Sequence, residues 1–166
     1  MDLPDATRHT LVLLRHAKSD WAEEVADIAR PLGKRGRRQA PEAGRWLNTG
    51  LDRIDLAVVS PAARAWGTWE LASAELARPP DPRVDNRVYA ASVDELLAVV
   101  RDLPDDLGTV LLVGHNPGLE DLVLRLTDEW VPMPTSAIAV VEVRGSWATA
   151  GQQAGFLRAA GRPPAG

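Results

Sequence analysis

The chain contains no cysteine among its 166 residues. That absence excludes disulfide bonds, zinc sites built on thiolates and any reaction that uses a cysteine nucleophile. No apolar run approaches the roughly 20 residues that a membrane-spanning helix needs, and residues 1–5 have neither the basic start nor the apolar stretch of a secretory signal. These absences predict a cytoplasmic protein without membrane contact, whose chemistry depends on other side chains.

A surplus of positive charge is also absent, because the net charge is -4 at pH 7. The chain therefore has no general attraction for nucleic acid. Its 45% apolar and 25% charged residues are typical of a globular protein. The length fits one domain, which we expect over residues 1–160, followed by a flexible tail over residues 161–166.

Four apolar runs predict buried strands: Leu11–Leu14, Leu56–Val59, Val110–Val113 and Ala137–Val143. Helical spacing predicts a helix over Arg35–Asn48, which Pro41 would kink or start late. Ser92 with Glu95 is typical of a capping box at a further helix start. Strands that alternate with helices predict an α/β fold, with a mostly parallel central sheet and helices on both faces.

Two further helices are predicted directly after the second and third strands. There a capping side chain is followed by proline at the expected first helical position, in Ser60-Pro61 and Asn116-Pro117. The proline-rich segment Ala77–Arg83 predicts a loop inside the domain. His9 precedes the first predicted strand and is interpreted as a solvated loop residue.

Candidate functional residues follow three of the predicted strands. Arg15 and His16 come after the first, Arg64 lies one turn into the helix after the second, and His115 follows the third. The carboxyl ends of parallel strands are where open α/β sheets bind ligands. Guanidinium and imidazole groups together stabilise the charge of a phosphoryl group in transfer without a metal. His16 is the better nucleophile candidate, since a residue between a buried strand and a tight turn has little freedom to lose.

Each candidate also has a structural interpretation. His115 could cap a helix, and Arg64 could pair with Glu70 or Glu75. Ser19 could donate to a phosphate or start a turn. The basic cluster near the first predicted helix is typical of a solvated face, or of a contact with an acidic partner; it comprises Arg30, Arg35, Arg37 and Arg38.

The stretch Leu11–Trp21 resembles the signature of the histidine phosphatase superfamily, which includes the cofactor-dependent phosphoglycerate mutases. Similar blocks follow over residues 30–40, 60–65 and 114–118, so the resemblance covers roughly residues 10 to 145. The small size and the Arg-His-Ala-Lys-Ser form are most similar to the compact bacterial SixA-type phosphohistidine phosphatases. The resemblance implies a phosphoglycerate-mutase-like fold.

The same resemblance implies a two-step reaction in which His16 accepts the phosphoryl group and water then releases it. Arg15, Arg64 and His115 would bind the phosphate oxygens, and Ser19 and Asn116 are further candidates for substrate binding. A backbone carbonyl would fix the His16 tautomer, and nearby arginines would keep the ring unprotonated. No cofactor is implied, and the wide separation of the three histidines predicts no metal site.

One expected residue of the wider family is missing, the carboxylic acid that protonates a leaving alkoxide. Residues 88–92 contain no carboxylate, and Asp94 and Glu95 belong to the next predicted helix. Four other acids stay open as candidates: Asp20, Glu23, Glu24 and Asp85. An imidazole leaves from phosphorus with less help, so the missing acid favours phosphohistidine as the substrate. The resemblance to SixA-type phosphatases implies that a phosphorylated histidine phosphotransfer domain carries it. The alternatives are a small phosphomonoester as substrate, or a phosphate-recognition module without turnover.

Overall fold

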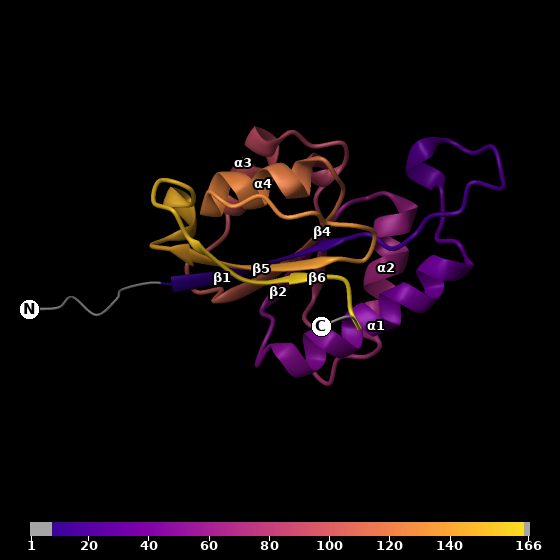
Figure 1. Cartoon of the computed structure of the whole chain (residues 1–166), viewed down its shortest axis with the longest axis horizontal. Helices are drawn as coiled ribbons and strands as arrows, with labels where there is room; N and C mark the ends of the chain where they lie inside the picture. The colour runs from indigo at the N-terminus through magenta and orange to yellow at the C-terminus, as the bar shows by residue number, and fades with distance from the viewer. Residues whose placement is uncertain (1–7, 165–166) are drawn as a thin grey trace, which may run out of the picture.

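A six-stranded sheet forms the centre of the computed structural model, which describes residues 8–164 (Figure 1). Its strands are β1 (Arg8–Arg15), β2 (Leu56–Val59), β3 (Pro82–Val84), β4 (Thr109–Gly114), β5 (Ile138–Arg144) and β6 (Phe156–Gly161). Their order across the sheet is β3-β2-β4-β1-β5-β6. The four strands from β3 to β1 pair in parallel, and β5 and β6 are antiparallel to their neighbours. The predicted α/β fold with a mostly parallel sheet is therefore confirmed.

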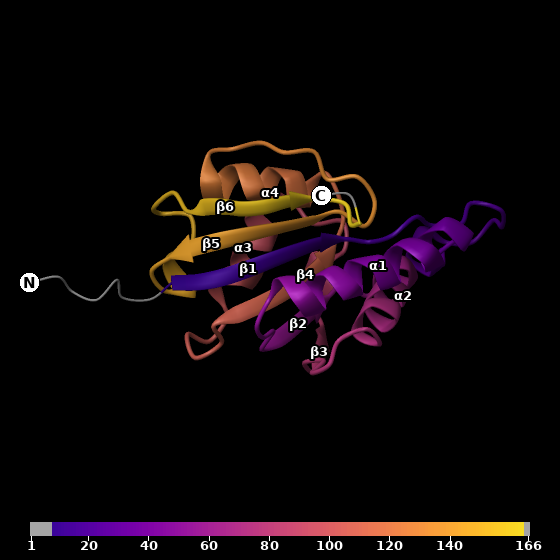
Figure 2. The same ribbon diagram turned by 60° about the horizontal axis from the view of Figure 1, so that its bottom comes forward.

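Two pairs of helices cover the two faces of this sheet (Figure 2). They are α1 (Lys34–Gly50) and α2 (Ala63–Ser73) on one face, and α3 (Val93–Arg101) and α4 (Gly118–Thr127) on the other. Three short 3-10 turns complete the structure: η1 (Asp27–Ala29), η2 (Asn86–Val88) and η3 (Trp147–Thr149). Within residues 8–164, no helix is long and apolar enough to cross a bilayer.

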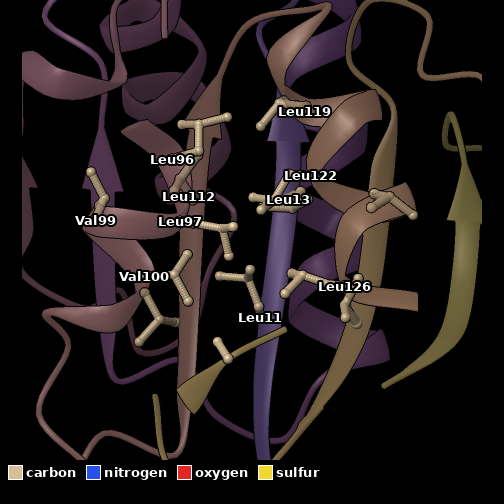
Figure 3. Packing of buried hydrophobic residues seen from close by; sticks show 14 of the residues in the cluster. Leu11, Leu13, Leu96, Leu97, Val99, Val100, Leu112, Leu119, Leu122 and Leu126 are labelled. Atoms are coloured by element: carbon tan, nitrogen blue, oxygen red, sulfur yellow. The ribbon is translucent and has the colours of Figure 1, made fainter. Parts of the chain in front are cut away.

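Both faces of β1 are buried over Leu11–Leu14, which explains the uninterrupted apolar sequence of this part of the strand. Leu11 and Leu13 belong to the cluster beneath α3 and α4, where Figure 3 shows Leu13 beside Leu122. Val12 and Leu14 belong to the cluster beneath α1 and α2. Each fully buried side chain of this kind contributes about 1.5–3 kcal/mol. This double burial fixes the end of β1, where the candidate residues begin.

The helix boundaries agree with the sequence except at two starts. The α3 capping box is confirmed, because the Ser92 hydroxyl accepts from the Glu95 amide and the Glu95 carboxylate accepts from the Ser92 amide. Pro41 lies inside α1, which extends from Lys34 and so does not start late. The prediction that Pro61 and Pro117 are the first helical residues is wrong, since α2 starts at Ala63 and α4 at Gly118.

One local expectation from the sequence is wrong, and two others are wrong at one end. His9 is not a solvated loop residue: it lies in β1 with 2% exposure, and carbonyl oxygens of Gly145 and Asp105 lie 2.8 and 3.0 Å from its two ring nitrogens. The predicted loop Ala77–Arg83 is confirmed over residues 77–81, and its last two residues belong to the edge strand β3. The predicted tail starts one residue too early, because Gly161 pairs with Ile138 in β6; its flexibility stays a prediction, and residues 165–166 lie outside the described residues.

Candidate active site

His16 sits one residue beyond β1, and its main-chain amide donates to the Gly114 carbonyl at 3.0 Å. That bond continues the pairing of β1 with β4 past the end of the strand. The Nδ1 atom of His16 lies 2.8 Å from the carbonyl oxygen of Ala17. Since a carbonyl only accepts, Nδ1 carries the proton and Nε2 keeps a free lone pair. This is the backbone contact that the sequence analysis expects.

The pKa of His16 is lowered to about 4. Burial is the largest cause, and the positive charges of Arg64, Arg15 and Arg30 act in the same direction against the Ala17 hydrogen bond. The residue is only 7% exposed, so water does little to stabilise an imidazolium there. His16 is therefore neutral at pH 7, the form in which its Nε2 is a nucleophile.

His115 follows β4 and lies beside His16, with the two ring centroids 5.1 Å apart. Its Nε2 atom is 2.7 Å from the Ser60 hydroxyl oxygen, which comes from the end of β2. The pKa of His115 is lowered to about 3, first by burial and then by His16 and Arg64. The sequence analysis predicts Ser60 only as a helix cap. Its hydroxyl does accept from the Ala62 amide, but it also contacts the second histidine.

The two predicted arginines, Arg15 at the end of β1 and Arg64 in α2, both lie near His16 and lower its pKa. Arg15 donates from Nη1 to the carbonyl of Met133 at 3.1 Å. Arg64 donates from Nη1 to the carbonyl of Asp27 at 2.8 Å and from Nη2 to its carboxylate at 3.1 Å. The interpretation of Arg64 as a partner of Glu70 or Glu75 is therefore wrong, and Glu75 pairs with Arg45 instead.

Arg30 is a further arginine of the site that sequence reasoning assigned to a solvated cluster. It is only 9% exposed, its guanidinium lies 3.5 Å from the centre of the Trp21 ring, and it pairs with Asp27. Its charge also contributes to the lowered pKa of His16. The other members of the predicted cluster, Arg35, Arg37 and Arg38, are exposed as expected.

Three buried side-chain nitrogens in residues 8–164 have no hydrogen-bond partner: Arg15 Nε, Arg30 Nε and His115 Nδ1. All three belong to the surroundings of His16. An unpartnered buried polar group costs about 1–3 kcal/mol, and native proteins contain few of them. Two guanidinium groups and an imidazole with unpartnered nitrogens are together suited to an anion whose oxygens accept hydrogen bonds from them.

The two remaining substrate-binding candidates are held by the fold. Ser19 is 8% exposed and forms an isolated antiparallel bridge with Leu32. Asn116 donates from Nδ2 to the Met133 carbonyl at 2.8 Å, and its Oδ1 accepts from the Glu120 amide at 3.3 Å. A substrate contact by Ser19 or Asn116 stays a prediction.

Asp27 contributes a carboxylate to the site, and the sequence analysis did not consider it. Hydrogen bonds from Tyr89, Arg64 and Arg30 lower the pKa of Asp27 to about 2, so it is ionised and has no proton to give at neutral pH. Of the four candidate acids, Asp85 pairs with Arg87, which lowers the Asp85 pKa. Asp94 and Glu95 lie in the first turn of α3, as predicted. Over residues 8–164, no group of three or more histidines and carboxylates is placed to hold a metal ion.

Comparison with known proteins relates this site to one family. The model of the histidine phosphatase superfamily (branch 1) matches residues 11–89. An uncharacterised protein of Mycobacterium tuberculosis (strain H37Rv) is 37% identical over 146 residues, which cover 81% of this chain and 90% of that protein. A SixA structure from Nakamurella multipartitia is 32% identical with a TM-score of 0.86, covering 96% of this chain and 99% of that one. A protein histidine phosphatase SixA complexed with tungstate is 26% identical with a TM-score of 0.80, covering 93% and 97%.

Proposed function

Because the chain belongs to the histidine phosphatase superfamily, we propose that it is a metal-independent phosphatase that removes phosphate from phosphohistidine on a protein, through a phosphohistidine intermediate on His16. The observation that carries the proposal is the neutral, fixed imidazole of His16, whose Nε2 is free for attack. The similarity to the protein histidine phosphatase SixA supports the choice of substrate. A phosphorylated histidine phosphotransfer domain is the partner that this substrate implies.

In the first step, His16 Nε2 attacks phosphorus and the bond from phosphorus to the substrate imidazole breaks. The electron pair of that bond stays on the departing nitrogen. Arg15 and Arg64 bind the phosphoryl oxygens, whose charge is largest during transfer. In the second step, water attacks phosphorus, loses a proton to solvent and releases inorganic phosphate from His16.

The ionised state of Asp27 supports a nitrogen–phosphorus bond as the target. A leaving alkoxide needs a proton from a general acid, and Asp27 is not one at neutral pH. An imidazole with a proton on its second nitrogen leaves as a neutral ring. The site is therefore better suited to phosphohistidine than to a phosphate ester.

The test is mass spectrometry of protein quenched rapidly after brief exposure to phosphohistidine protein at neutral pH. We expect a phosphoryl adduct on His16, and we expect His16→Ala to lose both the adduct and the turnover. An active protein whose adduct maps to another residue would overturn the assignment. A wild-type protein that binds the phosphorylated partner without turnover, and a His16→Ala variant that keeps this affinity, would show a recognition module instead.

A further inference from the structure

Asp27 places one negative charge among the positive charges of the site. Its carboxylate accepts hydrogen bonds from Arg30, Arg64 and Tyr89, which come from three separate parts of the chain. Tyr89 in turn presents its ring edge-on to His115, with the centroids 5.7 Å apart. The carboxylate thus contacts Arg64, a candidate phosphate-binding residue, directly, and only the Tyr89 side chain lies between it and His115.

Asp27 also lies on the open side of the site. Its side chain is 49% exposed, whereas the residue exposure of His16 is 7%. In an in-line displacement the leaving group departs on the side opposite the nucleophile. Because His16 is buried, the remainder of the substrate extends toward solvent, where the Asp27 side chain is exposed beside Arg64. We therefore expect the leaving group to come within range of the Asp27 charge.

A fixed carboxylate at this position has opposite effects on two kinds of leaving group. It repels a substrate that carries a second anionic group near its phosphate. It attracts an imidazole ring that holds a proton on its second nitrogen, since the ring is then cationic until the phosphorus–nitrogen bond breaks. Protonation there lets the ring leave as a neutral molecule, so the same charge assists departure.

We propose that Asp27 is a specificity-determining residue, which selects phosphoryl donors with a neutral or cationic nitrogen leaving group and rejects phosphate esters that carry a nearby carboxylate. This inference rests on the proposed function of the site. Arg30 and Tyr89 hold the carboxylate in place. The main-chain carbonyl of Asp27 anchors Arg64 at 2.8 Å independently of the side-chain charge.

That separation makes Asp27→Asn the informative variant, because it removes the charge and leaves the main-chain contact to Arg64. The segment from Trp21 to Ala29 is exposed along its length, so the substitution does not disturb the core. Asp106→Asn is the control, since it removes one charge from an exposed position before β4, at the opposite end of that strand from His115. The substrates to compare are phosphoimidazole and 3-phosphoglycerate.

We expect Asp27→Asn to lower the ratio of kcat/KM for phosphoimidazole over 3-phosphoglycerate about tenfold, as loss of one partly screened charge contact would. Asp106→Asn should leave the ratio unchanged. An equal loss for both substrates in Asp27→Asn would overturn the inference, because Asp27 would then only position Arg64. An equal change of the ratio in Asp106→Asn would also overturn it, because the effect would then come from the overall charge of the protein and not from Asp27.

A binding measurement separates this inference from the proposed function. Titration calorimetry with inorganic phosphate and with phosphoglycolate needs no turnover. Asp27→Asn should tighten phosphoglycolate binding relative to phosphate about fivefold. If neither substrate is turned over, the proposed function fails, while an altered binding ratio still supports the charge effect of Asp27. An unaltered ratio overturns the inference about Asp27 even in an active enzyme.

Discussion

His16 and His115 lie together because β1 and β4 are parallel neighbours in register. Arg15 pairs with Gly114 at the last position of the two strands, and the next residue of each chain carries an imidazole. The ring centroids are 5.1 Å apart, and burial lowers the pKa of both rings. Two neutral imidazoles beside arginines are thus a direct result of strand pairing and burial.

The first prediction concerns the pH dependence of turnover. Because the pKa of His16 is about 4, the loss of kcat/KM that protonation of His16 causes should begin only below about pH 5. An exposed histidine would lose activity around its ordinary pKa of about 6.5. The measurement is a pH profile of phosphoimidazole hydrolysis with the spontaneous rate subtracted, alongside an NMR titration of the His16 ring.

A charge variant checks the cause of this shift. Arg30→Gln removes one of the cations that lower the pKa of His16, so the acid limb of the profile should move to higher pH. Arg35→Gln, an exposed change in the same basic cluster, should leave it in place. An acid limb near pH 6.5 in the wild-type protein would contradict the neutral, desolvated nucleophile.

Much of this arrangement follows from the sequence, because the core strands are continuous apolar runs. Leu11–Leu14 predicts a strand buried on both faces, and the residues directly after it must then lie at the sheet edge where ligands bind. The same logic places His115 after Val110–Val113. The resemblance to the histidine phosphatase superfamily is likewise confirmed.

What the sequence did not predict depends on contacts between distant residues. Asp27 meets Tyr89 across 62 positions of the chain, and nothing near either residue signals the contact. His9 is polar and precedes an apolar run, yet carbonyl oxygens 96 and 136 positions away face its ring nitrogens. The edge strand β3 is exposed throughout, so it has no apolar pattern to detect.

The second prediction concerns Thr68, a buried residue of α2 that supports the turn after His16. Its hydroxyl accepts from the Ala17 amide at 2.9 Å and donates to the Arg64 carbonyl at 2.7 Å. Thr68→Val leaves that buried amide unpartnered, which should lower the free energy of unfolding by about 1–3 kcal/mol. It should also lower kcat about tenfold, because the turn that orients His16 loses its support.

Thr127→Val provides the matched control for Thr68→Val. Thr127 is a buried threonine of α4 whose hydroxyl donates to the Val123 carbonyl and accepts from the Glu129 amide. Its substitution should cost similar stability, measured by urea denaturation, with kcat of the folded protein unchanged. Thr68→Ser should restore kcat. If Thr68→Val reduces only stability, Thr68 has no part in positioning His16.

The third prediction is that turnover survives removal of divalent metal ions. The proposed steps use an imidazole nucleophile and guanidinium groups to stabilise the phosphoryl charge, so no step needs a metal. The measurement is phosphoimidazole hydrolysis after dialysis against EDTA, with and without added magnesium or zinc. Activity that is lost on chelation and restored by either ion would contradict the mechanism.

The fourth prediction uses two glycines of α1 that are in close contact with other backbone segments. A Cβ atom at Gly36 would lie only 2.1 Å from the Lys18 carbonyl oxygen, two residues beyond His16. A Cβ atom at Gly44 would lie 2.2 Å from the Ala72 carbonyl oxygen, at the distal end of α2. Either substitution by alanine must push backbone aside, and both should lower the free energy of unfolding by at least about 1–3 kcal/mol.

Only the first of these changes should alter the chemistry. Gly36→Ala displaces the segment that follows His16, so the KM for phosphoimidazole should rise and kcat should fall in the protein that stays folded. Gly44→Ala separates α1 from α2 away from the site, so its activity should fall only in proportion to the unfolded fraction. Kinetics normalised to the folded fraction from circular dichroism distinguish the two. If Gly36→Ala keeps full activity per folded molecule, the Lys18 contact does not control the position of His16.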